Sequence, residues 1–126
     1  MDDSQSNGIT EKIIGCAFEV HGVLGSGFLE KVYENALLEE MRSRGFKAEA
    51  QKPIPVLYKN KVVGEYFADI IVEDVVIIEL KALEKLSDFH ELQLKNYLRA
   101  TGIEVGLLIN FGRSVEIKRK FVGKVW

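Results

Sequence analysis

The sequence of 126 residues has one cysteine, no long apolar run and no signal peptide pattern, and each of these observations excludes a class of protein. A single cysteine, Cys16, excludes an internal disulfide bond and favours a reducing compartment, so we expect a cytoplasmic location. No apolar run approaches the roughly 20 residues that span a bilayer. The polar, acidic N-terminus does not resemble a signal peptide. We therefore expect no association with a membrane.

Repeats, low-complexity stretches and linker-like segments are also missing, which predicts one domain over residues 1–126. With 17 Lys and Arg against 19 Asp and Glu, the chain has no general basic excess for binding phosphate backbones. Its only prolines, Pro53 and Pro55, cannot donate to a strand ladder, so their segment is expected at a sheet edge. Neither Gly-x-Ser-x-Gly nor Gly-x-Gly-x-x-Gly opens a helix, which argues against α/β-hydrolase and dinucleotide-binding folds.

Hydrophobic periodicity indicates two helices, then several strands, a third helix and two further strands, with glycines after the second and third helices. Ser87 or Asp88 is expected to cap the third helix, with Glu91 in capping-box position relative to Asp88. Several strands are apolar on both faces, which predicts an α/β fold with a mixed β-sheet flanked by helices on both faces. The helices are expected at about 10–24, 28–44 and 88–101, and the strands at 46–51, 54–58, 61–72, 75–82, 104–110 and 115–121.

The most informative segment places Asp69, Glu79 and Lys81 inside two runs of Ile and Val. Charged side chains are rarely buried unless they are paired or coordinate a ligand. Glu79 and Lys81 are two residues apart on one strand, so they share a face. A two-residue turn before this strand would put Asp69 on the other face, whereas a three-residue turn or a bulge would place Asp69 opposite Glu79. If Asp69 and Glu79 share a site, the connection between the two strands is therefore predicted to be a three-residue turn or to contain a bulge.

In that register, the two carboxylates and the Leu80 carbonyl form an all-oxygen half-shell that suits Mg²⁺ or Mn²⁺. Such an ion would activate a water and polarise a phosphoryl group, and Lys81 would lie beside both. The same Glu-x-Lys pattern is also typical of a solvated charged strand, so the pattern alone leaves both interpretations open.

Two further pairs lie on the predicted helices, Glu30 with Tyr33 and Gln93 with Tyr97, each about one turn apart. Taken singly, these residues are equally typical of a first-turn acid, core tyrosines and a solvent-facing glutamine. His90, one turn before Gln93, is typical of a structural or surface histidine.

Taken together, these residues resemble the PD-(D/E)xK nuclease superfamily, and more narrowly its family named for the motif GxxExxY. The resemblance spans about residues 10–122 and implies a restriction-endonuclease-like fold. Two positions depart from the pattern: Ala68 replaces the motif proline, and Phe67 stands where many relatives have arginine. The matching segments are residues 27–33, 68–69, 78–82, 90–98 and 106–112.

The resemblance implies a metal site and a substrate-binding set on this chain. Lys81 is expected to assist attack on the phosphate, beside a site for Mg²⁺ or Mn²⁺. The residues implied for the metal are Asp69, Glu79, Leu80 (through its backbone carbonyl) and Glu30, and those for the substrate are Gln93, Tyr97 and Tyr33.

The function that follows is a Mg²⁺-dependent nuclease that hydrolyses phosphodiester bonds in DNA or, alternatively, in RNA. The negative net charge and the missing arginine support a second reading, a non-catalytic nucleic-acid-binding or protein-interaction module that keeps the nuclease fold. A third reading is a subunit whose site is completed by a second copy of the chain or by a partner.

Overall fold

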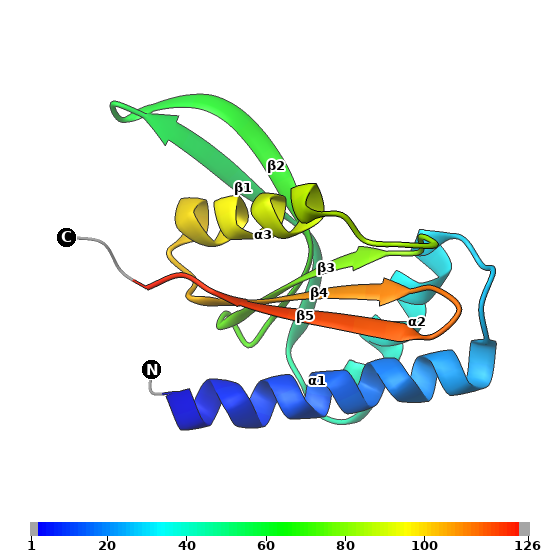
Figure 1. The fold of residues 1–126 in the computed structure, drawn as a ribbon. Helices are drawn as coiled ribbons and strands as arrows, with labels where there is room; N and C mark the ends of the chain where they lie inside the picture. Colours follow the sequence, from blue (N-terminus) through cyan, green and yellow to red (C-terminus); the bar gives the residue numbers. More distant parts are fainter. Residues whose placement is uncertain (1–2, 124–126) are drawn as a thin grey trace.

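The computed structural model describes residues 3–123, with side chains from residue 7 onward. Its described part has one five-stranded sheet in the order β1-β2-β3-β4-β5, parallel between β3 and β4 and antiparallel elsewhere (Figure 1). The predicted mixed α/β architecture is confirmed. The elements are α1 (Asp3–Leu24), α2 (Glu30–Ser43), β1 (Ala48–Tyr58), β2 (Lys61–Val72), β3 (Val76–Lys81), α3 (Asp88–Thr101), β4 (Val105–Phe111) and β5 (Val115–Phe121).

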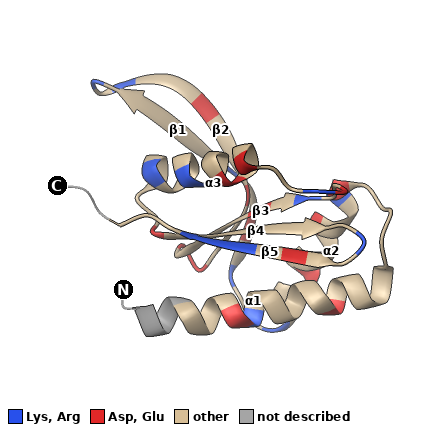
Figure 2. Ribbon diagram, viewed as in Figure 1, with Lys and Arg blue, Asp and Glu red and all other residues tan. Residues whose placement is uncertain are grey.

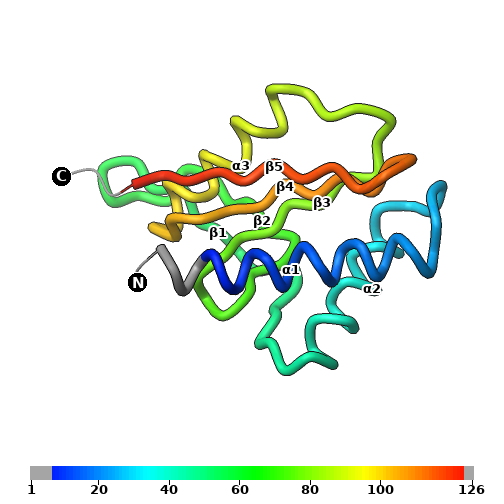
Figure 3. The backbone as a smooth tube through the Cα atoms, turned by 60° about the horizontal axis from the view of Figure 1, so that its bottom comes forward, coloured from blue at the N-terminus to red at the C-terminus, as the bar shows by residue number. Residues whose placement is uncertain are grey.

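Helices cover both faces of the sheet, as the apolar strands predict. The larger core packs α1 and α2 against one face and includes Ile13, Leu37 and Ile78. The smaller core packs α3 against the other face and includes Ile77 and Leu94. Figure 3 shows α1 and α2 together on one side of the strands and α3 on the opposite side.

The first helix begins well before the predicted start near Thr10, because the polar residues that precede Thr10 give no apolar period to read. Cys16 is fully buried on this helix, as its apolar neighbours predict. Within the described residues, no helix combines the length and the apolar composition needed to cross a bilayer.

The edge strand β1 is one continuous strand, although the sequence predicted two short strands at 46–51 and 54–58. Pro53 and Pro55 pair with Phe67 and Glu65 on β2, and their missing N–H groups cost no ladder bond with a further strand because β1 lies at the sheet edge. The edge position predicted for the prolines is confirmed.

Ser87, one of the two predicted N-caps of α3, is confirmed, whereas the capping box predicted for Asp88 and Glu91 does not form. Ser87 is the N-cap, and its backbone N–H donates to Nδ1 of His90 at 3.0 Å, so His90 takes the place expected for Glu91. Glu91 instead forms an ion pair with Lys120 of β5. The helix ends as expected at Gly102, which has the left-handed φ of +75° that a side chain would disfavour.

The turn between β2 and β3 has three residues, as a site shared by Asp69 and Glu79 requires. Val72 pairs with Val76, and Ile70 pairs with Ile78, so residues 73–75 form the connection and Val75 is left outside the ladder. The register therefore carries Asp69 to the position opposite Glu79. This prediction is confirmed.

The sheet divides at a point we call the fork, formed by Gln51, Asp69, Glu79 and Leu80. Beyond Ile70, β2 no longer pairs with β3 and continues with β1 alone. The β1–β2 ladder omits Gln51 and Asp69, and Gln51 has a φ of +52°, which is rare for a residue with a side chain. Past the fork the two strands form a projecting hairpin, residues 52–67, that we call the arm (Figure 1).

Candidate active site

The fork brings Asp69 and Glu79 together through hydrogen bonds that replace the missing ladder. The Asp69 backbone N–H donates to Oε1 of Glu79 at 3.2 Å, and the Leu80 backbone N–H donates to Oδ2 of Asp69 at 2.8 Å. Among the described residues, Oε2 of Glu79 accepts no hydrogen bond. Each carboxylate thus closes the gap between the strands with one oxygen and retains a second oxygen for a ligand.

Both carboxyl groups are held in surroundings that disfavour a bare negative charge. The Glu79 side chain is 5% exposed. Loss of solvation and, second, the Asp69 charge together raise its pKa to about 9. Burial also raises the pKa of Asp69, opposed by the hydrogen bond from Leu80. Two acids that resist ionisation in contact with each other indicate a place for a cation.

Lys81 ends β3 and lies half-buried beside these acids. Its positive charge lowers the pKa values of Asp69, Glu79 and Glu30, each against a larger rise from burial. Lys81 is therefore close enough to act on all three carboxylates. The structure brings together the acid–acid–lysine set that the sequence predicts.

Asn110 fixes the chain that follows Lys81, and the sequence analysis assigned it no such role. Its side chain is buried at the end of β4, where Oδ1 accepts from the Leu83 backbone N–H at 2.8 Å and Nδ2 donates to the Leu83 carbonyl at 2.9 Å. The available signal was a polar residue inside an otherwise fully buried strand. Asn110 thereby sets where β3 ends.

Glu30 is the first residue of α2 and lies in the wall of a cleft of about 530 Å³ that also includes Ala82 and Arg113. Partial burial is the main cause that raises its pKa, and the charges of Lys81 and Asp69 act on it in opposite directions. Its position at a helix N-terminus favours a negative charge. Glu30 is therefore placed at the rim of the site, next to the fork.

Tyr33 occupies a different place from the one predicted for it. The side chain has no exposed surface, and its ring stacks on Phe111 with centroids 4.7 Å apart. Its hydroxyl donates to the Gly25 carbonyl at 2.6 Å and accepts from the Phe28 N–H at 3.3 Å. The predicted substrate contact does not fit this burial; Tyr33 instead braces the turn that leads to Glu30.

Two residues at the fork escaped the sequence analysis, Glu34 and Gln51. Glu34 is 3% exposed and pairs with the Lys31 ammonium at 2.5 Å. The Gln51 amide donates to Oε1 of Glu34 at 2.9 Å and makes a longer contact of 3.5 Å with Oδ1 of Asp69. The only signal for Glu34 was its position one helical turn after Glu30, and Gln51 gave none, because its role depends on its unusual backbone.

Gln93 and Tyr97 lie on α3 beside the acids. The Gln93 amide donates to the Tyr97 hydroxyl at 2.9 Å, as their spacing of four residues allows. Burial, and then the charge of Glu79, raise the pKa of Tyr97, which places its hydroxyl near the fork. These two residues lie where a substrate held at the fork would meet them.

The donor set fits a hard divalent cation. Oxygen atoms of Asp69 and Glu79 meet at the fork, and Mg²⁺ and Mn²⁺ prefer such ligands and keep several waters. Among residues 3–123, no group of three or more His, Cys, Asp or Glu side chains lies close enough together to hold a metal ion, so Asp69 and Glu79 would share an ion with backbone oxygen, water or substrate. The set is therefore an open half-shell.

A mixed sheet covered on both faces, with paired acids and a lysine where two strands separate, defines a nuclease-like α/β protein. A family model described as the PD-(D/E)XK nuclease superfamily matches residues 7–120, and the chain belongs to this superfamily. Membership supports a nuclease-type function, and nucleases of this superfamily generally use divalent metals.

The comparison with solved structures agrees on the fold. The crystal structure of SSO0001 matches with a TM-score of 0.59 and 18% sequence identity, over 76% of this chain and 52% of that one. At this identity the likeness shows the fold alone, and the chain spans about half the length of that protein. A search of curated proteins found no matching sequence.

Proposed function

We propose that the protein is a Mg²⁺- or Mn²⁺-dependent nuclease that hydrolyses phosphodiester bonds in DNA. The observation that carries the proposal is the pair of hydrogen bonds across the fork, from the Asp69 backbone N–H to the Glu79 carboxylate and from the Leu80 backbone N–H to the Asp69 carboxylate, with the Lys81 charge beside them. The segment 27–33, with Glu30 at the rim of the site, supports assignment to the GxxExxY family within the superfamily.

The residues proposed to hold the ion are Asp69, Glu79, the Leu80 carbonyl and Glu30. When bound, the ion supplies a Lewis acid for a phosphoryl oxygen and lowers the pKa of a bound water. The protein positions these ligands through the fork hydrogen bonds and through the Gln51 amide, which restrains Asp69. Outer partners of this kind tune metal affinity by fixing ligand orientation.

Lys81 is proposed to neutralise the charge that builds on the phosphate, because its ammonium acts on all three acids from the end of β3. Asn110 keeps Lys81 in this position by clamping Leu83. Gln93 and Tyr97 are proposed to contact the nucleic acid next to the reacting phosphate.

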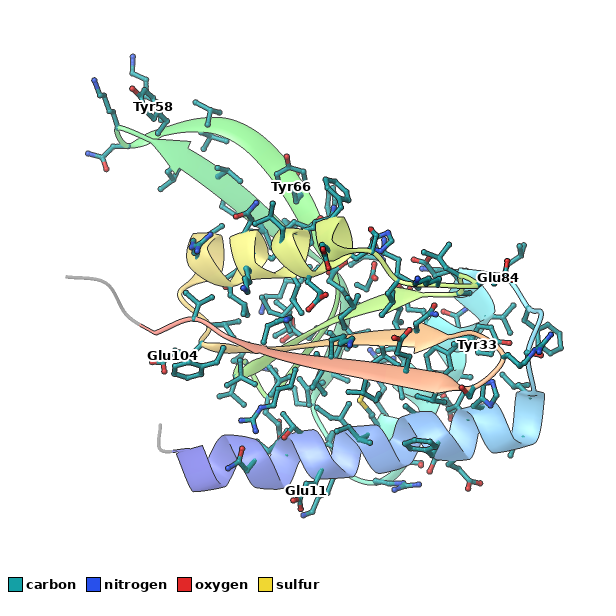
Figure 4. The ribbon with its side chains drawn as sticks, viewed as in Figure 1. Glu11, Tyr33, Tyr58, Tyr66, Glu84 and Glu104 are labelled. Atoms are coloured by element: carbon teal, nitrogen blue, oxygen red, sulfur yellow. The ribbon has the colours of Figure 1, made fainter. Side chains whose placement is uncertain are left out.

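The test is cleavage of single-stranded DNA, duplex DNA and RNA by the purified protein with Mg²⁺ or Mn²⁺. We expect cleavage of at least one DNA form, and its loss in Asp69→Asn and in the metal-free reaction. Glu11→Gln is the matched control, since Glu11 is an exposed acid on α1, far from the fork (Figure 4). Equal cleavage by wild type and Asp69→Asn would show that the activity belongs to a contaminant.

The second candidate is a non-catalytic nucleic-acid-binding or protein-interaction module. It is favoured by the small number of acids at the fork, since among the described residues no three His, Cys, Asp or Glu side chains are grouped closely enough to hold a metal ion. Titration calorimetry separates the two. Heat of Mn²⁺ binding that disappears in Asp69→Asn supports the nuclease, whereas a folded protein that binds no Mn²⁺ at millimolar concentration supports the module.

A further inference from the structure

A second cleft of about 500 Å³ opens beside the fork, between the arm and α3, and we call it the arm cleft. It joins the two strands of the arm to the outer face of the helix. Its wall is apolar on the arm side and polar on the helix side. The residues that line it include Val56, Leu57, Tyr66, Asn96, Tyr97 and Arg99.

Tyr66 offers the arm cleft an aromatic face. The side chain is 51% exposed, and its ring lies 5.5 Å from that of Tyr97, tilted by 42°. An exposed aromatic side chain of this size pays a hydration cost that a partner would relieve. Figure 4 shows Tyr66 on β2 above α3, while Tyr58 lies at the far tip of the arm.

The arm cleft lies next to the proposed active site, and Tyr97 links the two, since it lines the cleft and its pKa responds to the Glu79 charge. Tyr66 precedes Asp69 by three residues on β2, a separation of about 10 Å in an extended strand. Tyr97 lines the cleft and also receives the Gln93 hydrogen bond beside the acids. A strand of nucleic acid with one phosphate at the fork would therefore place a neighbouring nucleotide over Tyr66.

The helix side of the cleft carries positive charge. Nη1 of Arg99 donates to Oδ1 of Asn96 at 3.2 Å, which holds the guanidinium at the cleft and leaves its other N–H groups free to donate. Figure 2 shows basic bands on α3 and on the adjacent β5, although the whole chain has a formal net charge of −2. A polyanion is thus favoured on this side of the molecule.

We propose that the arm cleft binds one unpaired nucleotide of a DNA strand, with its base stacked on Tyr66 and its phosphate bound by Arg99. The proposal rests on the proposed function and names the substrate class: single-stranded DNA or an end whose strands have separated. In a duplex both faces of each base are covered by neighbours, so only an unpaired base can stack on Tyr66.

Binding tests the cleft without requiring cleavage. We would measure the anisotropy of a labelled single-stranded oligodeoxynucleotide in metal-free buffer with wild type, Tyr66→Leu and Tyr66→Phe. Loss of one stacked base weakens binding by roughly tenfold, so Tyr66→Leu should show this loss and Tyr66→Phe should stay within about twofold. Tyr58→Leu is the matched control, an exposed tyrosine on the same arm that does not line the cleft, and it should bind as wild type does.

Arg99→Gln adds an independent readout, since loss of one phosphate contact should reduce the slope of log affinity against log salt by about one. Wild-type affinity for single-stranded DNA that is absent, or that is unchanged in Tyr66→Leu, would overturn the proposal. Self-association that is lost in Tyr66→Leu, without DNA binding, would show that the cleft is a protein-docking surface instead.

Cleavage separates this inference from the proposed function. Strands that carry one abasic position near the cut should be poorer substrates for wild type and equal substrates for Tyr66→Leu. Cleavage that is unaffected by the missing base and by Tyr66→Leu would support the nuclease function and contradict the proposed nucleotide subsite. DNA binding that depends on Tyr66, without any cleavage, would support the subsite and contradict the nuclease function.

Discussion

The interior of the central strands β3 and β4 differs in composition from the fork, where β2 separates from the end of β3. From Val76 to Ile78 and throughout β4 every residue is buried, and most are aliphatic. At the fork, Glu79 is a buried acid, Asp69 faces it, and Gln51 has a left-handed backbone. Such features cost free energy and persist where surrounding structure enforces them. The comparison indicates that the buried central strands stabilise the fold, and that this stability allows the fork to keep destabilising features that serve binding.

The largest expected effect is on the free energy of unfolding and comes from a substitution in the central strand β3. Ile77→Ala removes a fully buried side chain between the sheet and α3, and should lower the free energy of unfolding by about 2–5 kcal/mol. Denaturant titration measures the change. Val63→Ala, an aliphatic truncation on the exposed arm, is the control and should alter stability by no more than about 0.5 kcal/mol. Equal losses in both variants would contradict the division of roles.

On the other side of the comparison, Lys81→Ala should affect chemistry far more than folding. Loss of one charge that stabilises the transition state should slow cleavage by roughly 10²- to 10³-fold. The unfolding midpoint should remain close to that of wild type, because Lys81 is half-buried at a strand end. Lys59→Ala, at the tip of the arm, is the matched control. A folding defect as large as that of Ile77→Ala would mean that Lys81 is structural.

Glu79→Gln should stabilise the metal-free protein by more than about 1 kcal/mol at neutral pH. The pKa of Glu79 is about 9 in the folded state, against an ordinary value of 4.5, so the folded state retains a proton that the unfolded state releases. Wild-type stability is therefore complete below about pH 4.5 and falls as pH rises toward 9, and glutamine removes this loss. Thermal melts across that range measure it. A lower melting temperature for Glu79→Gln than for wild type at pH 7 would show that buried Glu79 does not destabilise the folded protein.

The smallest expected effect comes from Gln51, whose amide is proposed to restrain Asp69. Gln51→Gly accepts the φ of +52° but loses the amide, so we expect Mn²⁺ affinity to fall roughly tenfold while stability stays within about 1 kcal/mol. Gln51→Asn keeps an amide and also tolerates this backbone, so it should recover part of the affinity. Calorimetry with Mn²⁺ gives both values. Unchanged affinity in Gln51→Gly would remove its proposed role.

How far the sequence predicts the structure depends on whether a feature is local. Strand β3 and the end of α3 at Gly102 follow from apolar runs and helix signals, and the three-residue turn follows from the requirement that Asp69 face Glu79. These features are decided by residues close in sequence or by strand parity, which the sequence contains.

Other features depend on contacts between distant segments. The Gln51–Glu34 contact joins β1 to α2 through a backbone conformation that no propensity indicates. Tyr33 matches the family motif but is buried by Phe111, nearly eighty residues later in the chain. The N-cap falls on Ser87 and not on Asp88, so His90 and not Glu91 is the third residue of the capping box, and Glu91 is free to pair with Lys120 of β5. Tertiary packing decided the first two of these.

Diffraction from crystals grown with Mn²⁺, recorded at a wavelength where manganese scatters anomalously, tests the central claim most directly. The account predicts one peak at the fork, about 2.0–2.3 Å from carboxylate oxygens of both Asp69 and Glu79, and no such peak in Asp69→Asn crystals. An empty fork in well-ordered wild-type crystals at saturating Mn²⁺, or a peak only at surface acids, would contradict it.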